Sequence, residues 1–181
     1  CLFLLNSADQ HGGAIHEIEN ARDVFNGCDF VGNTARGDGG ALYSDASNST
    51  VTNCLFATNE AQRGGAIATA ATDRGPGITG SRIIRNTALI EGGGMYRRQA
   101  ADLGYSATTV CSNVPDQVIG RWRDEGGNCV SDDCADCECV ADFNGDGHVN
   151  TLDVLAFLNA WTAGDYSADT NSDGSVDTLD L

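Results

Sequence analysis

The chain has 181 residues and a formal net charge of −16, which comes from 26 acidic residues, ten arginines and no lysine. A surface of this charge repels nucleic acid and anionic membranes and favours cations, so nucleic-acid binding is excluded. No stretch approaches the roughly 18 consecutive apolar residues of a membrane helix, and we expect no membrane insertion.

A motif repeats four times in the first half of the chain. Its first position is occupied by Cys1, Cys28, Cys54 and Ser81, so the steps are 27, 26 and 27 residues. A fixed period of this length indicates stacked structural units. In the first three copies Cys and Phe stand two residues apart and share one face of a short strand. A Gly-Gly turn and a second apolar strand follow. About one strand pair per period predicts an all-β solenoid, a parallel β-helix.

Stacked coils would place like residues over one another. The cysteines of the motif are expected to point inward as small apolar residues. The alternative fold is an antiparallel sandwich of amphipathic hairpins, which would not require these residues at a fixed phase. The asparagine of each copy would form an amide ladder at a turn, at Asn6, Asn33, Asn59 and Asn86.

The pattern Phe-x-x-Asn followed by Gly-Gly-Ala-Ile/Leu, over roughly residues 1–98, resembles the polymorphic outer-membrane protein repeat. The resemblance implies a right-handed, single-stranded parallel β-helix of the pectin lyase-like type on a secreted or cell-surface bacterial protein. Residues 101–131 keep a degraded copy, in which we align Cys111 with Ser81 and expect Trp122 to cover the end of the stack. The predicted solenoid domain spans residues 1–127.

Four cysteines follow within a short segment, at Cys129, Cys134, Cys137 and Cys139. Four thiolates so close together could bind zinc in a tetrahedral site. The other interpretation is a disulfide clasp, with Cys111 as a further partner. The spacing is compressed for a zinc site, and disulfides are the usual state of cysteine in secreted chains, which favours the clasp. We assign residues 128–140 to a junction.

Two twelve-residue stretches near the C-terminus have the pattern of a calcium loop. Oxygen-bearing side chains occupy positions 1, 3, 5, 9 and 12, glycine occupies position 6, and position 7 contributes its backbone carbonyl. The first loop supplies Asp142, Asn144, Asp146, His148, Asn150 and Asp153. The second loop, 27 residues later, supplies Asp169, Asn171, Asp173, Ser175, Asp177 and Asp180. The pattern predicts two Ca²⁺ sites.

A helix is predicted after the first loop, because Val154, Phe157, Leu158 and Trp161 follow the i, i+3, i+4, i+7 pattern. A calcium loop closed by aspartate and followed by a helix, present twice, resembles the type I dockerin. That resemblance implies an EF-hand-like module, residues 141–181, which binds a cohesin protein. The contacts that it implies are loop positions 10 and 11, at Thr151, Leu152, Thr178 and Leu179.

The two ends of the sequence predict a piece of a longer protein. Cys1 stands inside a repeat, and Leu181 follows a motif that should open a second helix. We therefore expect upstream coils and an incomplete second dockerin-like unit.

The outward strand positions of the four copies place no two carboxylates on neighbouring coils, so we expect no catalytic site in this chain. The leading hypothesis is a non-catalytic stalk, adhesin or display surface. It would be secreted or at the cell surface, and tethered through the dockerin-like module to a cohesin-like protein or a cell-surface component. The alternative is the end of a polysaccharide lyase or glycoside hydrolase whose catalytic coils lie upstream, with polysaccharide as its partner. A third hypothesis, an autotransporter passenger, conflicts with a dockerin-like end.

Overall fold

The computed structural model describes residues 1–18, 21–70, 75–98, 103–137, 143–144, 150–170 and 174–180. The chain divides into two compact units, Cys1–Cys137 and Glu138–Leu181. The first unit is a parallel β-solenoid, and the second contains one α-helix and short 3₁₀ turns within its described residues. No helix in the described ranges is long and apolar enough to cross a membrane.

Four sheets build the described part of the solenoid, and all strand pairs are parallel. Sheet A contains β1 (Leu2–Leu4), β5 (Asp29–Val31), β9 (Leu55–Ala57), β13 (Arg82–Ile84), β17 (Thr109–Cys111) and β20 (Cys129–Ser131). Sheet B contains β2 (Ser7–Ala8), β6 (Thr34–Ala35), β10 (Glu60–Arg63) and β14 (Thr87–Glu91). Sheet C contains β3 (Ile15–Glu17), β7 (Leu42–Ser44), β11 (Ile67–Thr69), β15 (Met95–Arg97) and β18 (Val118–Ile119). Sheet D contains β4 (Val24–Asn26), β8 (Thr50–Thr52), β12 (Gly77–Thr79), β16 (Leu103–Ser106) and β19 (Trp122–Asp124).

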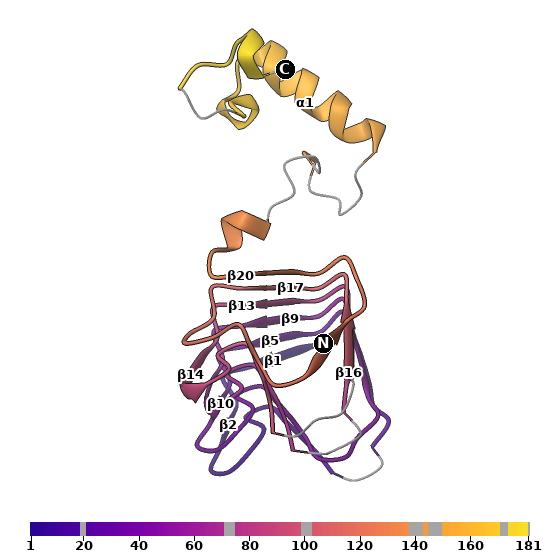
Figure 1. Cartoon of the computed structure of the whole chain (residues 1–181), viewed down its shortest axis with the longest axis vertical. Coiled ribbons are helices and arrows are strands. Elements are labelled where there is room, and N and C mark those ends of the chain that lie inside the picture. Colours follow the sequence, from indigo (N-terminus) through magenta and orange to yellow (C-terminus); the bar gives the residue numbers. More distant parts are fainter. Residues whose placement is uncertain are drawn as a thin grey trace. The chain divides into compact units, whose positions relative to one another are not determined.

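One passage of the chain through sheets A, B, C and D forms a coil, and coils one to four begin at β1, β5, β9 and β13. Figure 1 shows the strands of sheet A stacked in chain order. The parallel register confirms the predicted solenoid and excludes the antiparallel sandwich. Each coil has four strands instead of the predicted two. The strands of sheets B and D were not predicted from the sequence.

The repeat builds the core by placing the same inward position over itself. Phe30 pairs with Phe3 on one side and Phe56 on the other, and both ring pairs are stacked with centroids 4.6 Å apart. Ile83 and Val110 continue the row in coil four and beyond, and both are fully buried. This burial of apolar surface is the main stabilising contribution to the solenoid.

The predicted amide ladder is present at the corner between sheets A and B. Asn33 Nδ2 donates to Asn59 Oδ1 at 2.9 Å, and Asn59 Nδ2 donates to Asn86 Oδ1 at 2.8 Å. Each Oδ1 also accepts the backbone N–H of the asparagine one coil earlier. The ladder continues through Asn113 to Gln117, whose Nε2 donates to Asp132.

A second ladder lies at the corner between sheets D and A, and the sequence analysis did not predict it. Cys54 Sγ accepts the backbone N–H of Cys28 at 3.4 Å, and Ser81 Oγ accepts that of Cys54 at 3.1 Å. Thr108 Oγ1 then accepts the backbone N–H of Ser81, and Asn128 Oδ1 accepts that of Thr108. The buried cysteines, Cys28 and Cys54, are therefore hydrogen-bonding residues as well as apolar ones, which explains why Ser81 can replace cysteine. Cys1 is exposed, so the predicted inward stack is confirmed for Cys28 and Cys54 and not for Cys1.

This ladder corrects the alignment of the degraded copy. Thr108, not Cys111, occupies the position of Ser81, because its hydroxyl accepts the Ser81 N–H. Val110 then pairs with Ile83, and Cys111 pairs with Ile84 on sheet A. The period is therefore 27 residues here too. The alignment on Cys111 was wrong because it followed residue identity instead of the hydrogen-bonding position.

The Gly-Gly pair is required where two coils approach closely. Gly39 has a φ of +72°, in the left-handed region that L side chains rarely adopt. A Cβ atom on Gly40 would lie 2.1 Å from the carbonyl oxygen of Gly65 in the next coil. The first glycine therefore makes the turn, and the second allows the backbones of successive coils to pack against each other.

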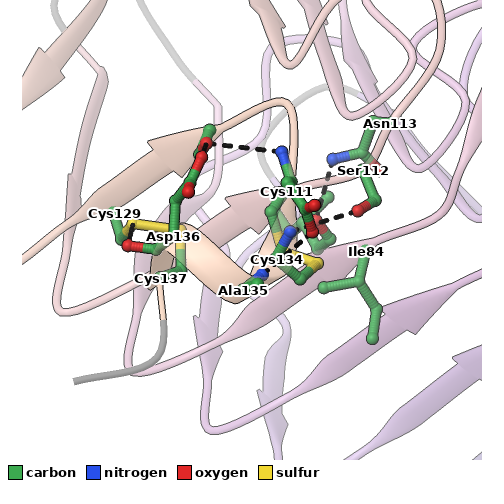
Figure 2. The surroundings of a disulfide bond; sticks show 12 residues. Ile84, Cys111, Ser112, Asn113, Cys129, Cys134, Ala135, Asp136 and Cys137 are labelled. Atoms are coloured by element: carbon green, nitrogen blue, oxygen red, sulfur yellow. Dashed lines mark hydrogen bonds between the residues drawn. A yellow bond between two sulfur atoms is a disulfide. The ribbon is translucent and has the colours of Figure 1, made fainter. Parts of the chain in front are cut away.

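Two disulfides fasten the end of the solenoid, as Figure 2 shows. The 3₁₀ helix η1 (Cys134–Cys137) is bonded to β17 through Cys111–Cys134 and to β20 through Cys129–Cys137. The disulfide clasp is thus confirmed, with Cys111 as a partner, and the zinc alternative is wrong for these cysteines. Cys139 lies outside the described residues. Trp122 packs partly buried against the core near this end.

Candidate functional site

The described residues of the first calcium-loop motif converge on Asp153. Its carboxylate accepts the backbone N–H of Asn144 at 3.1 Å and that of Asn150 at 2.7 Å, and the side chain is 3% exposed. Asn150 in turn caps helix α1 (Thr151–Ala163) by accepting the N–H of Leu152 at 2.8 Å. The capping box that starts the helix therefore joins loop positions 9 and 12, and a separate hydrogen bond joins position 3 to the same carboxylate.

The second motif closes in a similar way, except that the donor at its N-terminal end is loop position 2 instead of position 3. Asp180, in the 3₁₀ turn η3 (Thr178–Asp180), accepts the N–H of Thr170 at 2.9 Å and that of Asp177 at 2.8 Å. Asp177 accepts the N–H of Leu179 at 2.8 Å, as Asn150 does for Leu152. The carboxylate of Asp169, at position 1, accepts the N–H of Gly174 at position 6. The hydrogen bond between positions 9 and 12 is the same in both loops, which supports a common role for them.

Helix α1 contacts both motifs. Phe157 lies edge-on against Phe143 of the first loop, with ring centroids 5.3 Å apart. Trp161 donates its indole N–H to the carbonyl oxygen of Asp177, in the second loop, at 2.7 Å. The predicted helix is confirmed. Phe157 and Trp161 are partly buried, whereas Val154 and Leu158 are 59% and 41% exposed. The sequence analysis missed the role of the Trp161 indole, because a period of 3.6 residues identifies a face but not a polar partner.

Several predicted calcium ligands cannot be located. Asp142, Asp146, His148, Asn171 and Asp173 lie outside the described residues. Among the residues that the structure does describe, no group of three or more His, Cys, Asp or Glu side chains could hold a metal ion. The remaining predicted ligands do fit a calcium loop, since their side chains offer oxygen and the two closing aspartates draw the ends of each loop together.

The four residues predicted to contact a partner are exposed. Thr151 and Leu152 form the first turn of α1, and Thr178 and Leu179 occupy the equivalent positions of η3. Leu152 is 56% exposed and Leu179 is 74% exposed. Two equivalent pairs of Thr and Leu are therefore accessible on this unit.

Residues 140–181 match the dockerin type I domain. The match confirms the resemblance inferred from the two loops. Dockerin type I domains bind calcium and typically bind cohesin partners. Residues 27–45 match the repeat of the Chlamydia polymorphic membrane protein, which confirms the resemblance of the solenoid. Together the dockerin and repeat matches indicate an extracellular or surface protein. Comparison with curated proteins and with solved structures found no match.

Proposed function

We propose that the chain is a non-catalytic, secreted or cell-surface β-solenoid that is attached to a partner through its calcium-dependent dockerin module. The observation that carries the proposal is the paired closure of the two dockerin loops by the buried carboxylates of Asp153 and Asp180. The solenoid would act as a stalk or display surface, and the module would be its point of attachment.

Two Ca²⁺ ions would be held by the twelve loop residues predicted above, in an EF-hand-like arrangement. Residues 132–181 contain 12 acidic residues and no arginine or lysine, so their carboxylates repel one another in the absence of a cation. A bound Ca²⁺ would supply the charge that removes this repulsion. The chain's own contribution is the hydrogen bonding of Asp153 and Asp180, which holds the ends of each loop in place before the ion binds.

We also propose that the solenoid is of the right-handed, pectin lyase-like type. The right hand is supported because about 98% of crossover connections between parallel strands of one sheet are right-handed. The proposed domains are residues 1–127, a junction at 128–140 and the dockerin module at 141–181.

Cohesin is the partner proposed for the module, through Thr151, Leu152, Thr178 and Leu179. The exposure of both leucines supports a contact surface, since burial of an exposed leucine on binding is favourable. The equivalence of the two pairs would allow the partner to bind in two orientations related by the internal repeat.

The test is a calcium titration of the whole chain after removal of metal by a chelator, followed by calorimetry and circular dichroism. We expect two binding events and a gain in helix. The absence of binding at about millimolar calcium, the weak end for extracellular modules, would contradict the proposal. A type I cohesin on beads should then capture the calcium-loaded chain, and the double variant Leu152→Ala/Leu179→Ala should lose capture while its calcium binding is unchanged. Leu89→Ala, which removes an exposed leucine of the solenoid, is the matched control.

A further inference from the structure

The outer face of sheet B carries an open groove with a volume of about 420 Å³. We call it the sheet B groove. It combines hydroxyl, carboxylate, amide and guanidinium groups with one exposed aliphatic side chain, and its lining residues are Ser7, Thr34, Ala35, Arg36, Glu60, Ala61, Gln62 and Leu89. The dockerin module contributes no residue to it, so a ligand here would be a second function of the chain.

The groove is explained by a difference in length between successive coils. Between the pairs Ala61–Ala88 and Arg63–Glu91, β14 has one residue more than β10. Between the pairs Thr34–Glu60 and Asp38–Arg63, coil two likewise has one residue more than coil three. The shorter turn of coil three thus lies between two longer turns, which leaves a recess over β10.

The extra residue in β14 also exposes apolar surface. Strand bulges re-aim the side chains around them. Here the successive residues Leu89 and Ile90 are 71% and 51% exposed, whereas Ala88 just before them is buried. Leu89 consequently forms an apolar wall at one end of the sheet B groove, where a ligand could cover it.

The polar groups in the groove are available to a ligand. The side chains of Glu60 and Gln62 make no hydrogen bond or ion pair with any other residue that the structure describes. Arg36 pairs with Asp9 at 3.3 Å, but both side chains are more than 80% exposed, so this pair is weak and can exchange for a ligand.

Backbone groups on the floor of the groove are not available. Thr34 N–H donates to Asn6 O and Glu60 N–H donates to Asn33 O, each at 2.9 Å, and Gln62 N–H donates to Gly37 O. A ligand must therefore be recognised through side chains, which disfavours an extended peptide that needs main-chain hydrogen bonds.

We propose that the sheet B groove binds a neutral oligosaccharide chain that runs across the coils. Hydroxyl-rich rings need both donors and acceptors, which Arg36, Gln62 and Glu60 supply, and their C–H faces can pack against Leu89. Ser7, Thr34 and Glu60 pair in register on successive coils, so they repeat at about 4.8 Å, a step comparable to the length of one sugar ring. The central carboxylate of Glu60 and the negative charge of the whole chain disfavour an anionic polysaccharide.

The experiment is calorimetric titration of the whole chain, in calcium, with cellohexaose, xylohexaose and mannohexaose as neutral probes and with hexagalacturonate as the anionic probe. We expect saturable binding of at least one neutral probe and none of hexagalacturonate. The variants Glu60→Ala and Leu89→Ser should each weaken the neutral interaction by about tenfold, the effect of losing roughly one good contact.

Matched controls use exposed residues outside the groove. Asp29→Ala removes an exposed carboxylate of sheet A, and Val24→Ser removes a side chain that is 73% exposed on β4, close to the 71% of Leu89. Neither control should alter binding. The proposal is overturned if no neutral probe binds at millimolar concentration, if only hexagalacturonate binds, or if the groove variants bind as tightly as the controls. None of these outcomes depends on the dockerin module, whose function is tested by calcium and cohesin.

Discussion

The Nδ2 amide of Asn59 donates to Oδ1 of Asn86 across 2.8 Å, and neither side chain has exposed surface. Asn59 Oδ1 also accepts both the backbone and side-chain N–H groups of Asn33, and its Nδ2 donates to Phe30 O. The replacement Asn59→Ala should therefore lower the free energy of unfolding by about 3 kcal/mol or more, because each buried group left unpaired costs about 1–3 kcal/mol. Urea denaturation followed by circular dichroism measures the change.

The control for the ladder is Asn48→Ala, since Asn48 is exposed. A surface substitution of this kind should change stability by less than about 0.5 kcal/mol. Equal effects of the two variants would show that the ladder contributes nothing beyond local backbone geometry.

Cys54 should be replaceable by serine but not by an apolar residue of similar size. Its Sγ accepts the N–H of Cys28 and donates to Thr52 O, and Ser81 makes the same two contacts one coil later. Cys54→Ser should change the free energy of unfolding by less than about 1 kcal/mol. Cys54→Val should lower it by about 1–3 kcal/mol, because the Cys28 amide loses its acceptor.

The protonation state of Cys54 gives a second measurement. Burial raises the pKa of the Cys54 thiol, so the nucleophilic thiolate is scarce in the folded protein. A thiol reagent should modify exposed Cys1 quickly and Cys54 only after unfolding. Fast modification of both residues in the native protein would contradict the buried position of Cys54.

Glu17 is a buried carboxylate at the end of β3. It is 2% exposed, and it accepts the hydroxyls of Ser47, at 2.7 Å, and Ser49. Burial raises the pKa of Glu17, the hydroxyl hydrogen bonds from Ser49 and Ser47 oppose that rise, and the charge of Asp23 adds to it. The cluster joins the loops that follow sheet C in coils one and two.

A raised pKa means that the folded protein holds this proton more tightly than the unfolded chain does. The contribution of Glu17 to stability is then fully present below the ordinary carboxyl pKa and is lost as the pH rises through the raised folded value. Glu17→Gln should remove this dependence, so the variant should gain stability relative to the native protein as the pH rises above the ordinary carboxyl pKa of 4.5. Glu60→Gln, at an exposed position, is the control, and thermal unfolding across this pH range is the measurement. Parallel pH profiles of the native protein and Glu17→Gln would contradict the prediction.

Asp153→Ala should remove one calcium site and weaken helix α1. The carboxylate closes the first loop and accepts the N–H of Asn150 at the start of the helix, so its loss should cost about 1 kcal/mol of helix stability besides the metal site. Calorimetry should show one calcium ion bound instead of two, and Asp180→Ala should give the reciprocal loss. Asp29→Ala, on the outer face of the solenoid, should retain both ions. Two ions bound to Asp153→Ala would contradict the role of this residue as a ligand.

The sequence by itself determined the features that repeat. A step of 26 or 27 residues places Phe30 over Phe3 and Asn59 over Asn33, and a stacked solenoid gives equivalent positions equivalent environments. Both the core row and the amide ladder could therefore be predicted without coordinates. The two calcium-loop motifs could also be predicted from the sequence, because the residues that close each loop, at loop positions 9 and 12, are close together in the chain.

Only the tertiary structure decided the features that depend on partners in other coils. The acceptor role of Cys54 and the equivalence of Thr108 with Ser81 follow from hydrogen bonds between coils, which residue identity does not reveal. The pairing of Cys111 with Cys134 depends on which strand ends meet in space. The sheet B groove arises from a length difference of one residue between neighbouring turns, which acquires meaning only when the coils are stacked in register.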